Sequence, residues 1–355
     1  MLLNAIRAVL VGLAISGLAG AAEDITFERV YGPEVPGRYK HPAAIEELAN
    51  GDLYLVYYGG EGEYEGDTAV FGARKRAGEN SWPAPRVVAD TPFTGDGNAV
   101  VWQAPDGLVW LFYVCRFGET WSTSRIKAKV SRDGAETWSD SLLLTLEPGT
   151  MVRNRPIVLS NGEYLLPIYH ETGEDTEKTG ADTTSLFLRY NSKTKKWTET
   201  GRIRSPKGNL QPGVVELEPG HLIAYCRRAG DYLPTTKGYI VRSESRDYGQ
   251  TWAEGIDSKF PNPNAAIDFL KLRNGHLLLV YNNSMSDRTP LTAAISVDGD
   301  QSYAASRDIV SAPGDFGYPY AIQSRDGKIH LVYTSDERTV VNHAVFEEGA
   351  ILRRK

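Results

Sequence analysis

Arginine side chains lie near the ends of several apolar segments of this sequence. Arg153, Arg227 and Arg288 are three of them, separated by long stretches of chain. A guanidinium group binds a planar carboxylate through two parallel hydrogen bonds. If folding brings these arginines together, they form a site that attracts an anionic ligand. Comparable positions beside other apolar segments are occupied by Lys40, Gln211 and His170.

Four further residues could move protons or attack a substrate, namely Tyr318, His41, Glu63 and Asp67. A tyrosine hydroxyl has a reference pKa of about 10, so Tyr318 needs a base or nearby cations to react at neutral pH. His41, Glu63 and Asp67 could serve as acid or base. The sequence has no G-x-S-x-G, Walker, C-x-x-C or H-E-x-x-H motif, and the spacing of its histidines does not indicate a metal site. We therefore expect neither metal nor cofactor.

A repeated hairpin must position these residues. An apolar stretch, a polar turn with glycine and a second apolar stretch recur every 52 to 58 residues. The turn glycines are Gly51, Gly107, Gly162, Gly220, Gly275 and Gly327. Asn-Gly and Asp-Gly turns suit tight hairpins, and near-continuous apolar runs suit strands buried on both faces. Six such units predict a six-bladed β-propeller of four-stranded antiparallel blades.

The hairpins also divide polar residues between two ends of the propeller. The turn glycines share one end with ordinary turn-forming residues. Residues just before each inner strand, or just after its partner strand, share the other end. All of the candidates above belong to this second end, so we expect the functional site there.

A second repeat follows the hairpins. "SRDYGQTW" ends at Trp252, and two variants of it contain Asp133 and Asp298. The aspartate of this pattern accepts hydrogen bonds from turn amides, and its tryptophan packs under the hairpin. We therefore expect Asp133, Asp247 and Asp298 to be structural.

The sixth unit ends too early to supply its own outer strand. The segment 25–30 ("ITFERV") can fill that place and close the ring. The expected fold is therefore all-β, with the propeller closed by an N-terminal strand.

These motifs resemble the bacterial sialidase and sialidase-like Asp-box family over nearly the whole chain. The "VELEPGHLIAYCR" segment is similar to the one that ends in the family's second arginine, which implies this role for Arg227. Similar segments imply the third arginine at Arg288 and the nucleophilic tyrosine at Tyr318. The resemblance implies three arginines on a substrate carboxylate, a tyrosine nucleophile with a glutamate partner, and an aspartate acid/base.

Three positions depart from the family pattern. Lys40, followed by His41, stands where the first arginine is expected. Gln211 falls at or near the glutamate partner of the tyrosine, and an amide cannot take a phenolic proton. The loop that should carry the acid/base offers both Glu63 and Asp67.

The N-terminus reads as a signal peptide. Arg7, an apolar run over 8–18 and the small-x-small pattern of 19–21 predict cleavage near Ala21, a mature domain of 22–355 and export to the periplasm or the medium. No later segment is apolar enough to span a membrane. Cys115 and Cys226 could form a bridge, but we expect two buried thiols.

Net charge −6 argues against a nucleic-acid surface, and we expect an acidic carbohydrate as the partner. Three functions remain open. The first is a glycosidase of the exo-sialidase type that removes a terminal acidic sugar. The second is a polysaccharide lyase that acts on uronates, with tyrosine or histidine as base. The third is a non-catalytic carbohydrate-binding propeller.

Overall fold

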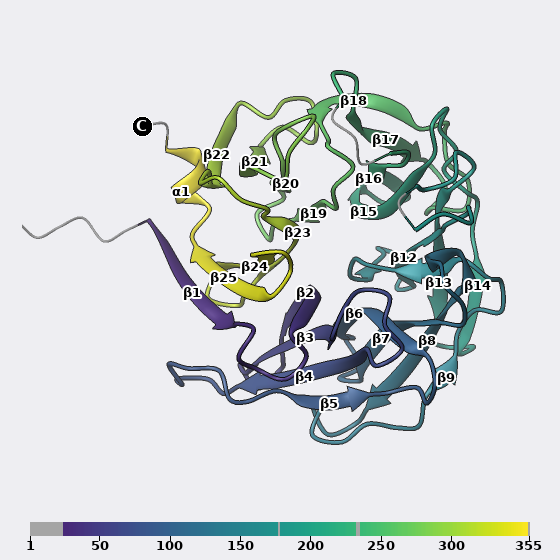
Figure 1. Cartoon of the computed structure of the whole chain (residues 1–355). Helices are drawn as coiled ribbons and strands as arrows, with labels where there is room; N and C mark the ends of the chain where they lie inside the picture. Colours follow the sequence, from purple (N-terminus) through teal and green to yellow (C-terminus); the bar gives the residue numbers. More distant parts are fainter. Residues whose placement is uncertain (1–23, 177, 232–234, 354–355) are drawn as a thin grey trace, which may run out of the picture.

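Six antiparallel sheets stand around a central axis in the computed structural model, which describes residues 24–176, 178–231 and 235–353 (Figure 1). The sheets follow one another around the ring in chain order. Each contains four successive strands from the axis to the rim, and the inner strand of the third blade is broken into two pieces. The prediction of a six-bladed, all-β propeller is confirmed.

The first blade contains β2 (Tyr39–Glu47), β3 (Leu53–Gly60), β4 (Ala69–Lys75) and β5 (Arg86–Ala89). The second contains β6 (Gly95–Gln103), β7 (Val109–Arg116), β8 (Ser124–Ser131) and β9 (Leu142–Leu143). The third contains β10 (Thr150–Val152), β11 (Ile157–Val158), β12 (Tyr164–His170), β13 (Thr184–Asn191) and β14 (Lys196–Glu199). The fourth contains β15 (Asn209–Glu218), β16 (His221–Arg228), β17 (Tyr239–Ser245) and β18 (Ile256–Pro261). The fifth contains β19 (Asp268–Lys271), β20 (Leu277–Asn282), β21 (Leu291–Ser296) and β22 (Ala305–Val310).

The last blade joins the two ends of the chain. It contains β23 (Gly317–Gln323), β24 (Ile329–Ser335), β25 (Val340–Phe346) and, outermost, β1 (Ile25–Tyr31). Antiparallel pairing sets Ile25 opposite Phe346 and Glu28 opposite His343. The N-terminal strand therefore closes the ring as predicted, and Figure 1 shows it beside the C-terminal strand. The predicted signal peptide, 1–21, lies outside the described residues.

The second strand of each blade carries much of the core. All eight residues of β7 and all six of β20 are buried. Such strands are covered on both faces by neighbouring blades, which explains their continuous apolar sequences. Cys115 and Cys226 are buried free thiols, as expected.

The aspartates of the "SRDYGQTW" pattern and its two variants stabilise the outer turns through hydrogen bonds. The Asp247 carboxylate accepts hydrogen bonds from the Thr251 amide at 2.9 Å and from the Thr251 hydroxyl at 2.6 Å. Asp133 and Asp298 make the same kinds of contact in their own turns. Trp252 stacks on Phe187 with ring centres 4.6 Å apart. The structural role predicted for these three aspartates is confirmed.

Helical structure is confined to a 3-10 turn, η1 (Trp121–Thr123), and to α1 (Gly349–Leu352) within the part of the chain that the structure describes. Neither is long or apolar enough to cross a bilayer.

Candidate functional site

Inner strands bulge where they begin, at the end of the propeller opposite the turn glycines. The pairing register shifts near Asn98 in β6, Gln211 in β15 and Tyr318 in β23. These three residues have φ angles of 42°, 52° and 56°, which non-glycine residues rarely adopt. Bulges and strained residues of this kind re-aim side chains and cluster at functional sites. Here all three side chains line one cavity.

This cavity has a volume of about 20 Å³ and adjoins a wider one of about 310 Å³. Glu63 and Tyr318 line both, so the two form one cleft, which we call the axial cleft. The inner part is also lined by His41, Asn98, Glu171, Gln211 and Arg227. The outer part is also lined by Tyr64, Ser286, Arg288, Asp315 and Arg338.

Tyr318 lies at the centre of the axial cleft and is 7% exposed. Its hydroxyl accepts a hydrogen bond of 2.9 Å from Arg227 Nη1. Arg227 also donates to Gln211 Oε1 at 3.1 Å and to Asn264 Oδ1 at 2.7 Å. These contacts fix the guanidinium of a fully buried arginine against the phenol.

Three arginines set the electrostatics of Tyr318. Burial alone would raise the pKa of the phenol, but the charges of Arg227, Arg288 and Arg338 outweigh it and hold the pKa of Tyr318 below its usual value. The guanidinium carbon of Arg288 lies 5.3 Å from the centre of the Tyr318 ring. A lowered pKa makes the phenol easier to deprotonate, which a tyrosine nucleophile or base requires.

Glu63 holds Arg338 in place. Its carboxylate forms an ion pair with Arg338 and accepts hydrogen bonds from Tyr39 Oη at 2.9 Å and Trp121 Nε1 at 3.3 Å. Glu63 therefore acts as an anionic anchor for the third arginine of the cleft.

Glu171 has the properties of a proton donor. It follows β12 directly and is half-buried in the inner cleft. Burial raises the pKa of its carboxyl to about 7, although the charge of Arg227 opposes the shift. Much of this carboxyl is therefore protonated at neutral pH, as a general acid must be.

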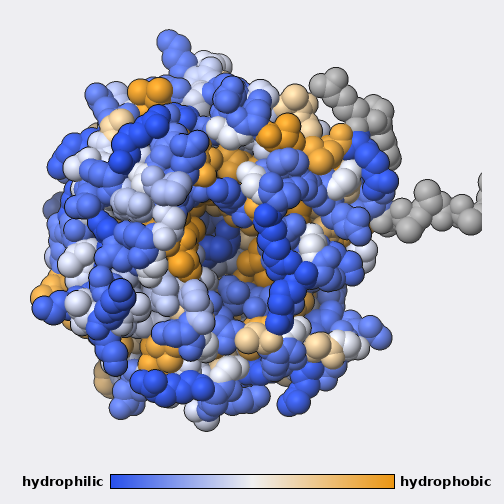
Figure 2. Space-filling model, turned by 180° about the vertical axis from the view of Figure 1, so that it is seen from behind, coloured by the Kyte–Doolittle hydropathy of each residue, from blue (hydrophilic) through white to orange (hydrophobic). Residues whose placement is uncertain are grey.

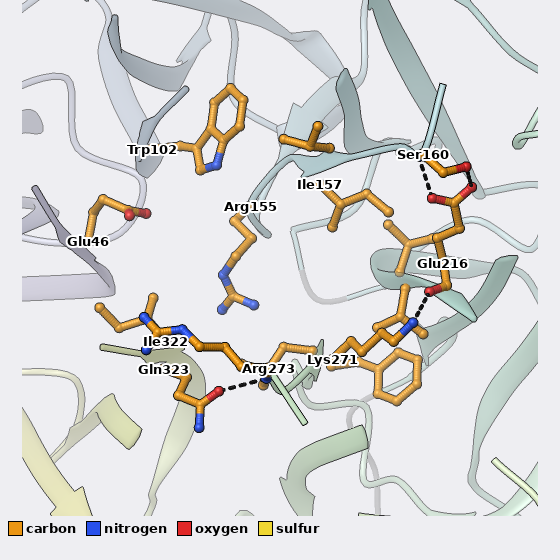
Figure 3. A pocket seen from close by; sticks show the side chains of 15 residues that line it. Glu46, Trp102, Arg155, Ile157, Ser160, Glu216, Lys271, Arg273, Ile322 and Gln323 are labelled. Carbon is orange, nitrogen blue, oxygen red and sulfur yellow. Dashed lines mark hydrogen bonds between the residues drawn. The ribbon is translucent and has the colours of Figure 1, made fainter. Parts of the chain in front are cut away.

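A larger cavity, of about 500 Å³, opens at the turn end. Side chains from all six blades line it, including Glu46, Trp102, Ile157, Val214, Phe269 and Ile322 (Figure 3). The molecule seen from behind is hollowed at the centre of the ring (Figure 2). Arg155 pairs with Asp268 at 2.6 Å, and Lys271 donates to the backbone carbonyl of Glu216 at 2.9 Å. The axial cleft is the better candidate for an anionic ligand because it gathers Arg227, Arg288 and Arg338 around Tyr318.

Comparison with known proteins agrees with this architecture. The family model described as "BNR repeat-like domain" matches residues 51–331. The chain belongs to the BNR repeat-like family. No curated protein matches its sequence.

Solved structures with the same fold as this BNR-repeat protein include two sialidases. The Hadza microbial sialidase Hz136 aligns with a TM-score of 0.73 and 16% identity, over 88% of this chain and 66% of that one. The NanB sialidase of Streptococcus pneumoniae aligns with a TM-score of 0.75 and 11% identity, over 92% and 71%. An α-L-arabinanase of Penicillium chrysogenum aligns with a TM-score of 0.66 and 16% identity, over 91% and 98%. The BNR-repeat chain thus shares the fold of these three proteins and spans about two thirds of the first sialidase.

The structure of this BNR-repeat protein brings together six of the residues singled out from the sequence. They are Tyr318, His41, Glu63, Arg227, Arg288 and Gln211, all of which line the axial cleft. Arg153 lies directly beneath, where it donates to the backbone carbonyl of Tyr318 at 2.8 Å.

Lys40, Asp67 and His170 line neither part of the cleft. The fully buried Lys40 ammonium donates to backbone carbonyls of the preceding loop, including Val35 at 3.0 Å. Asp67 is exposed and accepts a hydrogen bond from the Glu61 amide at 3.2 Å. His170 faces Glu147 at 3.4 Å. These three residues support loops around the site.

Sequence reasoning missed Arg338, which occupies the cleft while Lys40 does not. Arg338 comes soon after the second strand of its hairpin, so the rule that selected Arg227 could have found it. Glu171 satisfies the same rule. Its neighbour His170 was expected to bind substrate, but the residue of this pair that lines the inner cleft is Glu171.

Proposed function

We propose that this protein is a glycoside hydrolase that removes a terminal acidic sugar, such as a sialic acid, from a glycan. The observation that carries the proposal is the Tyr318 hydroxyl, held at 2.9 Å by Arg227 within the field of Arg227, Arg288 and Arg338. The sialidases among the proteins of similar fold support the choice of substrate class.

The carboxylate of the sugar would bind Arg227, Arg288 and Arg338, as guanidinium groups favour. When the carboxylate is attached to the anomeric carbon, a second carboxylate would be repelled from that carbon, whereas a tyrosine oxygen would not. Tyr318 then attacks the anomeric carbon and forms a covalent intermediate. Glu171 gives its proton to the departing glycosidic oxygen and later takes one from the water that hydrolyses the intermediate.

The test is hydrolysis of a fluorogenic sialoside by the wild-type protein and by Tyr318→Phe. The phenylalanine keeps the ring and its packing, so we expect kcat to fall by orders of magnitude while the thermal unfolding temperature stays unchanged. Turnover of the sialoside by Tyr318→Phe at the wild-type rate would refute the tyrosine mechanism.

Glu171→Gln provides an independent test. Because the Glu171 carboxyl loses its proton as pH rises through about 7, activity should decline on the alkaline side, and the glutamine variant should lose that limb of the profile together with most of its activity. Release of an unsaturated uronate from uronate-containing glycans would instead indicate a lyase. Binding of acidic sugars without any product would indicate a lectin-like role.

A further inference from the structure

The proton of the Tyr318 hydroxyl needs an acceptor that the proposed mechanism has not supplied. Arg227, the residue bound to this hydroxyl, is a donor. Gln211 lies nearby, but its oxygen accepts from Arg227 and its amide nitrogen donates to Tyr169 Oη at 3.3 Å. Glu63 is occupied by Arg338. None of these three groups is available as a base for the phenol.

His41 packs directly against Tyr318. The two rings meet edge to face with their centres 3.8 Å apart. His41 lies at the start of the bulge of β2 and Tyr318 lies within the bulge of β23, so two adjacent blades project these side chains to the same point. Both side chains line the inner cavity of about 20 Å³, a volume that holds one water molecule.

The hydrogen-bond network assigns the tautomer of His41. Thr334 Oγ1 donates its single proton to the backbone carbonyl of Gly317 at 3.3 Å. Since the same oxygen lies 3.2 Å from His41 Nδ1, it must accept a proton from that nitrogen. The other nitrogen, Nε2, therefore carries a lone pair, and it is buried without a hydrogen-bond partner among the described residues.

We infer that His41 Nε2 is the proton acceptor for Tyr318, acting through one water molecule in the inner cavity. This inference rests on the proposed function, because it supplies the base for the same nucleophile. Thr334 is the positioning residue that keeps Nδ1 protonated and Nε2 free.

The surrounding charges make this base responsive to the ligand. Burial and the charges of Arg338, Arg288, Arg153 and Arg227 hold the pKa of His41 well below its usual value. The rings that face it belong to Tyr39, Tyr58 and Tyr318. The carboxylates that line the same inner cavity are Glu63 and Glu171. A substrate carboxylate on the arginines would offset their field, so imidazolium would become stable only when an acidic sugar is bound.

The Tyr318 oxygen forms a bond to the anomeric carbon while the bond from that carbon to the glycosidic oxygen breaks. The phenolic proton passes through the water to His41 Nε2, and the glycosidic oxygen takes the Glu171 proton. In the second half, water gives a proton to Glu171 and its oxygen displaces Tyr318, which recovers its proton from His41.

Nuclear magnetic resonance of isotope-labelled histidine tests this inference without any turnover. The chain has 6 histidines, and His41→Gln identifies the signals of His41. We expect the Nδ1-protonated tautomer in the free protein between about pH 5 and pH 7. Addition of N-acetylneuraminic acid should raise the pKa of His41 so that it titrates in that range, whereas the neutral sugar galactose should leave it unchanged. An Nε2-protonated tautomer, or no response to the acidic sugar, would overturn the inference.

Two variants connect the base to catalysis. His41→Gln should lower kcat about a hundredfold or more, with His221→Gln, on the opposite end of the propeller, as the matched control. Thr334→Val keeps the side-chain shape but frees the tautomer, so it should lower kcat with little change in KM. If Tyr318→Phe abolishes hydrolysis but His41→Gln and Thr334→Val do not, the proposed function stands and the role of His41 fails. If Tyr318→Phe remains active, the proposed function itself fails.

Discussion

Replacing Arg227 by methionine should make Tyr318 a much weaker acid. Arg227 is 1% exposed and donates a hydrogen bond of 2.9 Å to the phenol oxygen. Methionine fills similar space without the charge. Two charges about 4 Å apart interact with about 4 kcal/mol at an effective dielectric constant of about 20. That energy corresponds to roughly a thousandfold change in the acid dissociation constant of the phenol.

Arg288 and Arg338 remain in the variant and keep part of the field. We therefore expect a decrease in the acid dissociation constant of Tyr318 of between about tenfold and about a thousandfold. The change can be followed by the ultraviolet difference absorbance of tyrosinate during an alkaline titration. Tyr318 is distinguishable because the other described tyrosines with a shifted pKa, including Tyr39, Tyr58, Tyr169 and Tyr320, all have it raised.

Two controls make the assay specific. Tyr318→Phe should remove the early tyrosinate signal, and Arg246→Met, at a side chain that is 71% exposed, should leave it in place. If the early tyrosinate forms at the same pH in the wild type and in Arg227→Met, Arg227 does not activate Tyr318, and the electrostatic reasoning is refuted.

Three further predictions concern the ligand and the stability of the ring. Arg288→Ala should weaken binding of N-acetylneuraminic acid by about 2–4 kcal/mol, measured by calorimetry, and an unchanged affinity would place the carboxylate elsewhere. Burial and the charge of His343 lower the pKa of His330 to about 4. The unfolded chain therefore binds more protons than the folded chain below about pH 6.5. The contribution of His330 to the free energy of unfolding is fully present above that pH and falls by at most about 3 kcal/mol as the pH drops toward 4. Denaturant titrations should show this loss, and His330→Asn should reduce it. Deletion of residues 24–31 should lower the thermal unfolding temperature because β25 would lose its outer partner, and an unchanged temperature would contradict closure by β1.

Much of the fold could be read from the sequence because hairpin turns and buried strands leave local signals. The turn glycines adopt positive φ angles, such as 92° at Gly51 and 90° at Gly327, which explains why glycine marks each hairpin. The place of β1 followed from counting strands. The last repeat ends before its outer strand, and only the N-terminal segment could supply that strand.

The site was less accessible to sequence reasoning, because it depends on where long side chains end. Lys40 and Arg338 illustrate the difficulty. The Lys40 amide donates to the Arg338 carbonyl at 2.7 Å, so the two backbones are adjacent, but the lysine side chain turns into its own loop while the arginine reaches the cleft. Similarly, Glu63 and Asp67 share one loop, and only contacts with Arg338, Tyr39 and Trp121 distinguish them. Such contacts join residues far apart in the chain.

The pairing of β1 with β25 also has consequences for how the protein folds. Ile25 is among the first described residues to be synthesised, and its partner Phe346 is among the last. Closing a loop of that length is entropically costly and slow, although the cost grows only with the logarithm of loop length. Five blades can form as the chain emerges, whereas the seam between β1 and β25 must wait for the last of them. We therefore expect the slowest refolding phase to report docking of β1, and mechanical or thermal opening to begin at this seam.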